Sequence, residues 1–385
     1  KGRVMQRANL LIALAAVAVI AAGMGGWWFL DQPAKPVAQP QNLAEVMGPS
    51  ADANQFARVT GPKPLDFPTD HGAHPDYRTE WWYFTGNLRS EQGDDYGFQL
   101  TLFRSALAPT QSERASDWAA RQVWMGHFAI TDINGQSHRA SERYQRGALG
   151  LAGATTHPVR VWLDDWRIES EREQTLFPLT LQANDPSNDM ALSLRLSADK
   201  AHVLQGDRGY SRKGANPANA SRYYSYTRLS AAGDIAWDER ELKVTGSAWL
   251  DREWSTSALD ANQQGWDWFA LQLDDGRDIM VYRLRRNNGA TDPNSAGIIV
   301  SRSGESQVLS AEDFSLEPTR FWQSPQTGSR YPVAWTITLA DTATTLQVDA
   351  RVDAQEMPTT VRYWEGAVRV SGDASGVGYL EMTGY

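Results

Sequence analysis

The sequence has no cysteine among its 385 residues. This absence excludes disulfide bonds, thiolate metal ligands, a cysteine nucleophile and a lipid-modified N-terminal cysteine. Positive charge is also scarce, because 37 Lys and Arg against 46 Asp and Glu give a net charge of -9, which does not suit a nucleic-acid partner. No Gly-x-Ser-x-Gly, His-Glu-x-x-His or Gly-Lys-Ser/Thr motif is present, so common hydrolase and nucleotide-binding chemistries lack support.

Charge is absent from residues 10–30, near the start of the chain. As a helix rising ~1.5 Å per residue, this run spans about 30 Å, the thickness of the hydrocarbon core of a membrane. Three basic residues precede it and Asp31 follows, so residues 1–31 are predicted to be a cytoplasmic tail and single-pass anchor of the cytoplasmic membrane, with the domains facing the periplasm or cell exterior. The alternative is a signal peptide cleaved near residues 21–23, which secretes the protein.

Residues 32–62 are rich in proline and lack an apolar period, which predicts an extended spacer. After it, short runs alternate between apolar and polar residues, as in residues 97–104, where Phe98, Leu100 and Leu102 share one face. Similar runs recur to the C-terminus, and Asp274-Asp275-Gly276 is typical of a hairpin turn. The prediction is all-β, with two consecutive β-barrel domains at residues 63–238 and 239–385.

Three segments combine clustered tryptophans with charged residues: 70–88, 246–273 and 363–385. On these motifs the chain, from about residue 64 to 385, resembles the CrtC/AttH-like family. That family includes carotenoid 1,2-hydratases and the AttH component of AttEFGH-type ABC transport systems, and many relatives are labelled predicted secreted hydrolases. The resemblance implies lipocalin-like barrels. It is closer to the AttH branch because two motifs stand intact: Glu80-Trp81-Trp82-Tyr83 and Tyr363-Trp364-Glu365-Gly366.

The hydratase branch differs at one motif, where it typically has Asp-His-Asn-Trp. This chain has Asp251-Arg252-Glu253-Trp254. Arginine stays protonated and cannot exchange a proton as imidazole does, so carotenoid hydration is not the expected reaction.

Alkene hydration needs a carboxylic acid that a dry site keeps protonated, beside aromatic faces that stabilise a carbocation. Asp251 and Glu253, next to Trp254, have suitable residue types and are the candidate catalytic acids. On a strand these two acids share one face, while Arg252 and Trp254 share the other. The competing interpretation is a structural network of arginine and carboxylate that closes a barrel end.

Glu80, placed among aromatic residues, needs a partner such as Arg104 or Arg252, and that pairing alone would explain it. His127 points either into a cavity or into a satisfied core position. The candidate ligand-binding residues are Glu80, Trp81, Trp82, Arg104, His127, Arg252, Trp254, Trp266, Trp268, Trp364 and Glu365.

Residues 70–76 contain two aspartates and two histidines, which are metal-ligand types. A short loop held by its own side-chain hydrogen bonds is the simpler interpretation, so we expect no metal and no cofactor.

Two functional hypotheses follow. The favoured one is non-enzymatic: the protein binds an apolar small molecule or lipid and serves an ABC-type exporter through its permease subunits, tethered by the N-terminal helix. The alternative is an enzyme that hydrates, isomerises or cyclises an apolar, isoprenoid-like substrate by acid catalysis. The CrtC/AttH-like resemblance is compatible with both.

Overall fold

The computed structural model describes residues 41–42, 55–108, 120–256, 259–341 and 343–385. They all belong to one compact unit, residues 41–385. The predicted anchor, signal peptide and most of the spacer lie outside the described residues. None of the helices within the described ranges has the length and apolar character to span a membrane.

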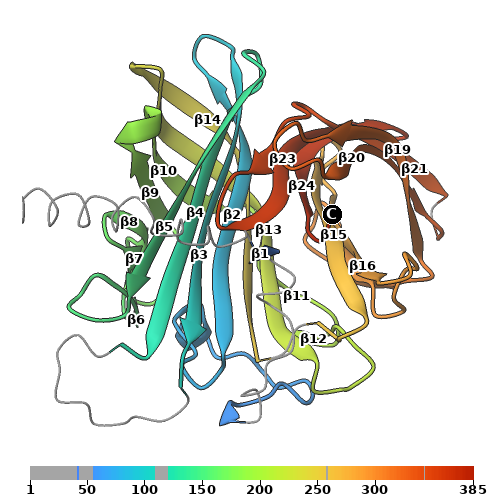
Figure 1. Cartoon of the computed structure of the whole chain (residues 1–385), viewed down its shortest axis with the longest axis horizontal. Helices are drawn as coiled ribbons and strands as arrows, with labels where there is room; N and C mark the ends of the chain where they lie inside the picture. The colour runs from blue at the N-terminus through green and yellow to red at the C-terminus, as the bar shows by residue number, and fades with distance from the viewer. Residues whose placement is uncertain (1–40, 43–54, 109–119, 257–258, 342) are drawn as a thin grey trace, which may run out of the picture. The chain divides into compact units, whose positions relative to one another are not determined.

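The first sheet has 13 strands and curls on itself (Figure 1). Its neighbouring strands, in order across the sheet, are β5 (Ser137–Arg146), β4 (Gln122–Asp132), β3 (Asp95–Ala106), β2 (Thr79–Ser90), β14 (Arg240–Ser255), β13 (Ala220–Trp237), β10 (Met190–Ala198), β9 (Leu179–Asp185), β8 (Trp166–Ser170), β7 (Val159–Leu163) and β6 (Ala152–Thr156). The short strands β11 (Val203–Leu204) and β12 (Tyr210–Arg212) add to β13.

The second sheet has 11 strands and also curls (Figure 1). Its order is β18 (Ser306–Ser310), β17 (Ala296–Val300), β16 (Asp278–Arg286), β15 (Gln263–Leu273), β24 (Gly376–Met382), β23 (Val361–Gly372), β21 (Thr344–Ala350), β20 (Arg330–Leu339) and β19 (Phe314–Gln323), while β1 (Gln41–Asn42) and β22 (Glu356–Met357) pair with β23. Two short 3-10 helices lie among the described residues, η2 (Thr69–His71) and η3 (Pro186–Asn188). The predicted all-β class with two barrel-like sheets is therefore confirmed.

The chain passes from the first sheet to the second between Ser255 and Gln263. The predicted boundary at residues 238/239 lies instead at the tight turn between β13 and β14, where Asp238 and Glu239 have positive φ. The observed boundary lies later in the chain than the predicted one, because β14 is a central strand of the first sheet and pairs with β13 on one side and with β2 on the other. A turn signal marks a hairpin, but it does not show which sheet the next strand joins.

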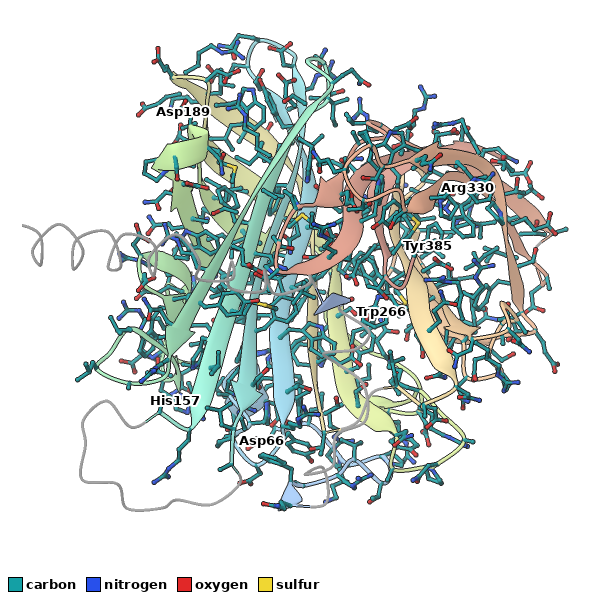
Figure 2. All side chains as sticks on the ribbon, in the orientation of Figure 1. Asp66, His157, Asp189, Trp266, Arg330 and Tyr385 are labelled. Carbon is teal, nitrogen blue, oxygen red and sulfur yellow. The ribbon has the colours of Figure 1, made fainter. Side chains whose placement is uncertain are left out.

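Successive side chains of a strand point to opposite faces, and in the first sheet both faces are buried at β2. On β2, Trp82 and Phe84 point into the core of the first sheet, whereas Trp81 and Tyr83 pack against the second sheet. The second sheet encloses its own core. Trp266 of β15 lies in the contact region between the sheets (Figure 2). Because β2 is buried on both faces, four aromatic residues can follow one another at positions 81–84 without exposing any of them fully.

Buried ion pairs fasten the two sheets together. The carboxylate of Asp278 on β16 lies 2.7 Å from the Lys200 ammonium and 2.6 Å from the Arg228 guanidinium, both supplied by the first sheet's part of the chain. Arg351 reaches back to Asp95 of β3 at 2.7 Å. These contacts, of which the Arg351–Asp95 pair is only partly buried, link the second sheet to the first.

Candidate functional site

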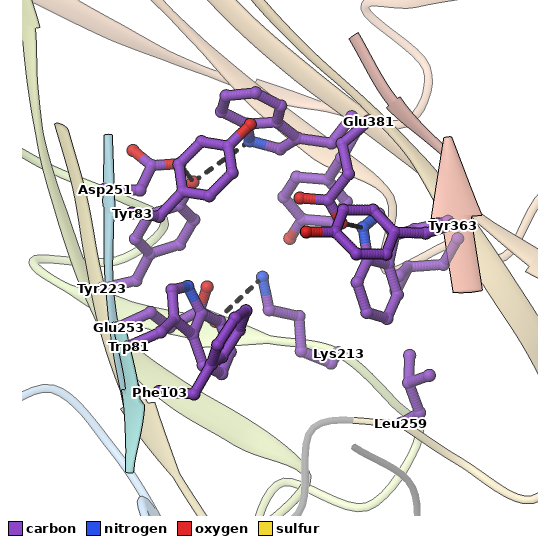
Figure 3. A pocket seen from close by; sticks show the side chains of 14 residues that line it. Trp81, Tyr83, Phe103, Lys213, Tyr223, Asp251, Glu253, Leu259, Tyr363 and Glu381 are labelled. Carbon is purple, nitrogen blue, oxygen red and sulfur yellow. Dashed lines mark hydrogen bonds and ion pairs between the residues drawn. The ribbon is translucent and has the colours of Figure 1, made fainter. Parts of the chain in front are cut away.

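A pocket lies between the two curled sheets rather than inside either of them. It contains about 770 Å³ of space free of protein atoms, a volume that includes open solvent. Figure 3 shows Asp251, Tyr83 and Tyr223 on one wall and Glu381 and Tyr363 on the other. This inter-sheet pocket is lined by Trp81, Tyr83, Phe103, Lys213, Tyr223, Asp251, Glu253, Leu259, Trp266, Trp268, Tyr282, Leu284, Tyr363 and Glu381.

Asp251 of β14 is buried in the first wall of the pocket. Its Oδ1 accepts hydrogen bonds from the Ser225 hydroxyl at 2.5 Å and from the Trp249 indole at 2.7 Å, and its Oδ2 accepts one from the Tyr223 hydroxyl. Burial raises the pKa of Asp251 to about 7, although the three hydrogen bonds act against this shift. The pocket therefore contains a carboxyl that can give or take a proton at neutral pH.

Glu381 of β24 is half-buried on the opposite wall and accepts a hydrogen bond from the Trp266 indole at 2.7 Å. Burial raises the pKa of Glu381 to about 8, and the nearby Asp251 and Glu253 add to the rise. Glu365 stands directly opposite Glu381 in the β23/β24 register. Burial also raises the pKa of Glu365 well above its usual range, and Glu381 contributes to this. Both acids are expected to be protonated at neutral pH.

Glu253 is the pocket acid that has a cationic partner. Its Oε1 lies 3.4 Å from the Lys213 ammonium and accepts a hydrogen bond from Ser221. The Lys213 ammonium also lies 4.2 Å from the centre of the Tyr282 ring. Burial alone lowers the pKa of a lysine, but Glu253 and Tyr282 outweigh it and raise the pKa of Lys213. Glu253, the second predicted catalytic acid, is therefore held in an ion pair with Lys213.

A hydrogen-bonded chain runs from the pocket wall toward the surface. The Tyr363 hydroxyl lies 2.8 Å from Nδ1 of His127, and Nε2 of His127 lies 3.0 Å from Oε1 of Glu142. His127 is fully buried and does not line the pocket. The sequence left two positions open for His127, in a cavity or in the core with its hydrogen bonds satisfied. The structure has the second, with Tyr363 between His127 and the pocket.

The predicted residues Glu80, Arg104 and Arg252 lie in the first sheet, outside the inter-sheet pocket. The carboxylate of Glu80 accepts hydrogen bonds from both arginines. Its Oε2 also lies 3.2 Å from His74, whose ring stacks on Trp254 at 3.8 Å. Burial alone raises the pKa of Glu80, but Arg252, His74 and Arg104 hold it well below its usual range. We call these four residues, Glu80, His74, Arg104 and Arg252, the Glu80 network. Their pairing with one another accounts for the buried charges without a ligand.

The alternation predicted for β14 places its residues as expected. Asp251 and Glu253 face the pocket, while Arg252 and Trp254 face the first core. The guanidinium of Arg252 lies 3.8 Å from the centre of the Trp82 ring, so Trp82 and Trp254 are packing partners of a buried cation and not pocket walls.

Of the other predicted tryptophans, Trp81, Trp266 and Trp268 line the pocket, but Trp364 does not. Trp364 is fully buried in the second core and donates its indole hydrogen bond to the carbonyl of Asp353 at 2.8 Å. The next residue of β23, Glu365, faces the contact region between the two sheets. There the Tyr83 hydroxyl donates a hydrogen bond to Oε1 of Glu365 at 2.5 Å.

This difference predicts opposite outcomes for two tryptophan variants. Trp364→Ala should destabilise the fold by about 3–5 kcal/mol, because it leaves a cavity in a closed core. Trp266→Ala, at a half-buried pocket wall, should cost less stability but weaken apolar ligand binding. Urea unfolding and titration with all-trans-retinol, a fluorescent polyene, measure both effects. Equal stability losses would show that the two indoles have the same structural role.

Sequence reasoning missed several pocket residues, among them Tyr223, Lys213, Tyr282 and Glu381. Glu381 lies in the C-terminal segment, residues 363–385, that carries the family resemblance, so the sequence contained a signal that could have identified it as a site residue. Lys213 lies in, and Tyr223 follows, a Gly- and Asn-rich stretch at residues 206–221, a composition typical of a loop. Nothing in their local pattern indicates that this stretch turns toward the second sheet.

The histidine-rich loop at residues 70–76 is held by side chains. His74 lies 3.0 Å from Asp70 through Nε2, and His71 lies 2.6 Å from the Tyr224 hydroxyl through Nδ1. Over the described ranges, no group of three His, Cys, Asp or Glu residues is arranged to hold a metal ion.

Comparisons with known proteins give a consistent result. A family model described as AttH-like matches residues 58–385. A crystal structure described as an AttH from Nitrosomonas europaea has 35% identity and a TM-score of 0.77, covering 86% of this chain and 100% of that one. Kievitone hydratase from Nectria haematococca has the same fold, with 14% identity and a TM-score of 0.66 over 90% of this chain and 97% of its own. A comparison with curated proteins found no match.

Proposed function

The chain belongs to the AttH-like family, and from that premise we propose that it binds a neutral, apolar alkene in the inter-sheet pocket and hydrates it by acid catalysis. One observation carries this proposal: Asp251, with a pKa raised to about 7, lies in a pocket walled by tryptophan and tyrosine rings. Of the two hypotheses that the sequence left open, this geometry favours the enzymatic one.

The proposed reaction requires one proton donor and one water molecule. Asp251 gives its proton to one alkene carbon, and the alkene's π electron pair forms the new C–H bond. The other carbon becomes a cation, which the neighbouring aromatic faces stabilise. Water adds to this cation through an oxygen lone pair, and its surplus proton returns to the Asp251 carboxylate. The net reaction is alkene plus water to alcohol, with the acid regenerated.

Tyr223 is well placed to assist this transfer. Its hydroxyl donates a hydrogen bond to Asp251 and lies 3.3 Å from the Trp268 indole nitrogen, and its side chain lines the pocket beside that acid. Burial raises the pKa of Tyr223 well above its usual range, so it carries its proton throughout. The shared fold with kievitone hydratase supports hydration as the reaction class.

The test is incubation with neutral isoprenoid alkenes in water labelled with oxygen-18. We use geraniol, farnesol and squalene, and detect labelled alcohol by mass spectrometry. The expected result is enzyme-dependent incorporation of one labelled oxygen into at least one substrate. Absence of incorporation from all three, with wild-type protein that binds them, would contradict the proposal.

A second candidate function rests on family membership: the protein carries an apolar molecule or lipid for an ABC-type transport system without changing it. In that proposal residues 10–30 anchor the chain in the cytoplasmic membrane, or are cleaved after export, and the domains act outside the cytoplasm beside permease subunits. Native mass spectrometry of detergent-extracted protein separates the candidates. Co-purification of a lipid that stays unmodified on incubation favours carriage, and its hydration favours catalysis.

A further inference from the structure

Glu365 and Glu381 form an acid pair beside the pocket, in which Glu381 lines the pocket and Glu365 stands next to it on the neighbouring strand without lining it. The two residues face each other across β23 and β24, on the side that points toward the first sheet. Glu365 is 1% exposed, and its Oε1 accepts the Tyr83 hydroxyl at 2.5 Å. Its Oε2 is buried and has no hydrogen-bond partner among the described residues. A buried carboxyl oxygen without a donor is costly unless a ligand or a proton satisfies it.

Aromatic rings surround this acid pair. Trp268 stands opposite Glu381 in the β15/β24 register, and its ring meets that of Tyr83 edge to face at 5.2 Å. Trp266 donates to Glu381. Lys213, the lysine that lines the pocket, is already paired with Glu253. Lys213 is therefore not the partner of the acid pair. Carboxyls that lie beside aromatic faces are suited to bind an organic cation.

Resting on the proposed function, we propose that the end of the pocket at Glu381 binds a positively charged apolar group, with Glu381 as the counterion that it meets and Glu365 as the buried acid paired with Glu381. In the reaction this group is the carbocation that forms after proton transfer. Its stable chemical equivalent is a quaternary ammonium of similar shape. The pocket is then complementary to the charged intermediate rather than to the neutral alkene, which is what catalysis requires.

The acid pair predicts that binding of such a cation releases protons. Burial raises the pKa of Glu381 to about 8 and that of Glu365 well above its usual range, so at neutral pH both are protonated, and one acid of the pair must ionise to face a single cation. Affinity for a permanent cation therefore rises with pH up to about 8, while affinity for a neutral ligand does not. The titratable and charged groups that face this pair from the packed strands and the adjoining loop are Tyr83, Tyr223, Asp251, Glu253, Lys213, Tyr282, Tyr363 and Tyr379.

The experiment compares two isosteric probes, 1-naphthylmethyl-trimethylammonium and 1-neopentylnaphthalene, which differ by one nitrogen for one carbon. Naphthalene fluorescence measures binding to the whole protein at several pH values. The expected result is an ammonium preference of about tenfold or more near pH 8. That preference should fall by up to about tenfold per pH unit below it, as one proton is released per cation bound.

Glu365→Gln and Glu381→Gln should each reduce the ammonium preference and leave the neutral probe's affinity within about twofold, because glutamine resembles the protonated acid. Glu356→Gln, at a buried acid of β22 outside the pocket, is the matched control and should change neither affinity. Equal affinity of wild-type protein for both probes at every pH would overturn the inference while leaving the proposed function intact. Failure of both probes to bind would contradict the apolar pocket itself, and with it the proposed function.

Discussion

Asp251→Asn is expected to lower the rate of oxygen-18 incorporation by about 100-fold or more while the protein stays folded. Asparagine keeps the size of the aspartic acid. Its oxygen can accept the hydrogen bonds from Ser225 and Trp249, and its amide can donate to the oxygen of the Tyr223 hydroxyl, which in the wild-type protein donates to Asp251. What it lacks is a proton to give to the alkene. The measurement is the initial rate with the alkene that wild-type protein converts fastest.

Two comparisons make this result specific. Asp185→Asn changes a buried acid that lies outside the pocket, so turnover should stay within about twofold. Glu381→Gln changes the other pocket acid with a pKa near neutral. If Glu381→Gln abolishes turnover and Asp251→Asn does not, Glu381 is the proton donor and the assignment to Asp251 is wrong. Urea unfolding of each variant separates loss of chemistry from loss of fold.

The second large effect concerns stability. Glu80→Ala should destabilise the protein by about 3–5 kcal/mol, because it leaves the guanidinium groups of Arg104 and Arg252 buried without their carboxylate. Both arginines are fully buried, so water cannot replace the lost charge. Urea unfolding at neutral pH measures the change in the free energy of unfolding.

An exposed ion pair supplies the control. Glu171 lies 2.6 Å from Arg195 with both side chains in solvent, so Glu171→Ala should cost less than about 1 kcal/mol. Replacing all three charges of the Glu80 network by apolar residues of similar size, as Glu80→Leu, Arg104→Met and Arg252→Met together, should cost less than Glu80→Ala alone. A Glu80→Ala cost no larger than that of Glu171→Ala would show that the network does not stabilise the fold.

The sequence predicted the fold class because strand alternation is a local pattern. Phe98, Leu100 and Leu102 share one face of β3 as expected, and the hairpin at residues 274–276 joins β15 to β16. The boundary between the sheets was not predictable in the same way. It depends on β14 pairing with β2, which lies more than 150 residues earlier in the chain, and no local signal encodes such a pairing.

The candidate site was predictable in part for the same reason. Alternation correctly separated Asp251 and Glu253 from Arg252. It did not show that Arg252 pairs with Glu80, or that the acids face a second sheet. A pocket whose walls come from both sheets is assembled by tertiary contacts, so single-strand patterns identify its residues without revealing which of them meet.

The account depends most directly on one claim, that acids of the inter-sheet pocket carry protons at neutral pH. Infrared spectroscopy tests it, because the carbonyl stretch of a protonated carboxyl lies at higher frequency than the bands of a carboxylate. The expected result is a protonated-carboxyl band at about pH 6 that loses intensity as the pH passes through about 7 and 8. The band should be weaker in both Asp251→Asn and Glu381→Gln. A spectrum with no such band at about pH 6, or one that neither variant changes, would contradict the account.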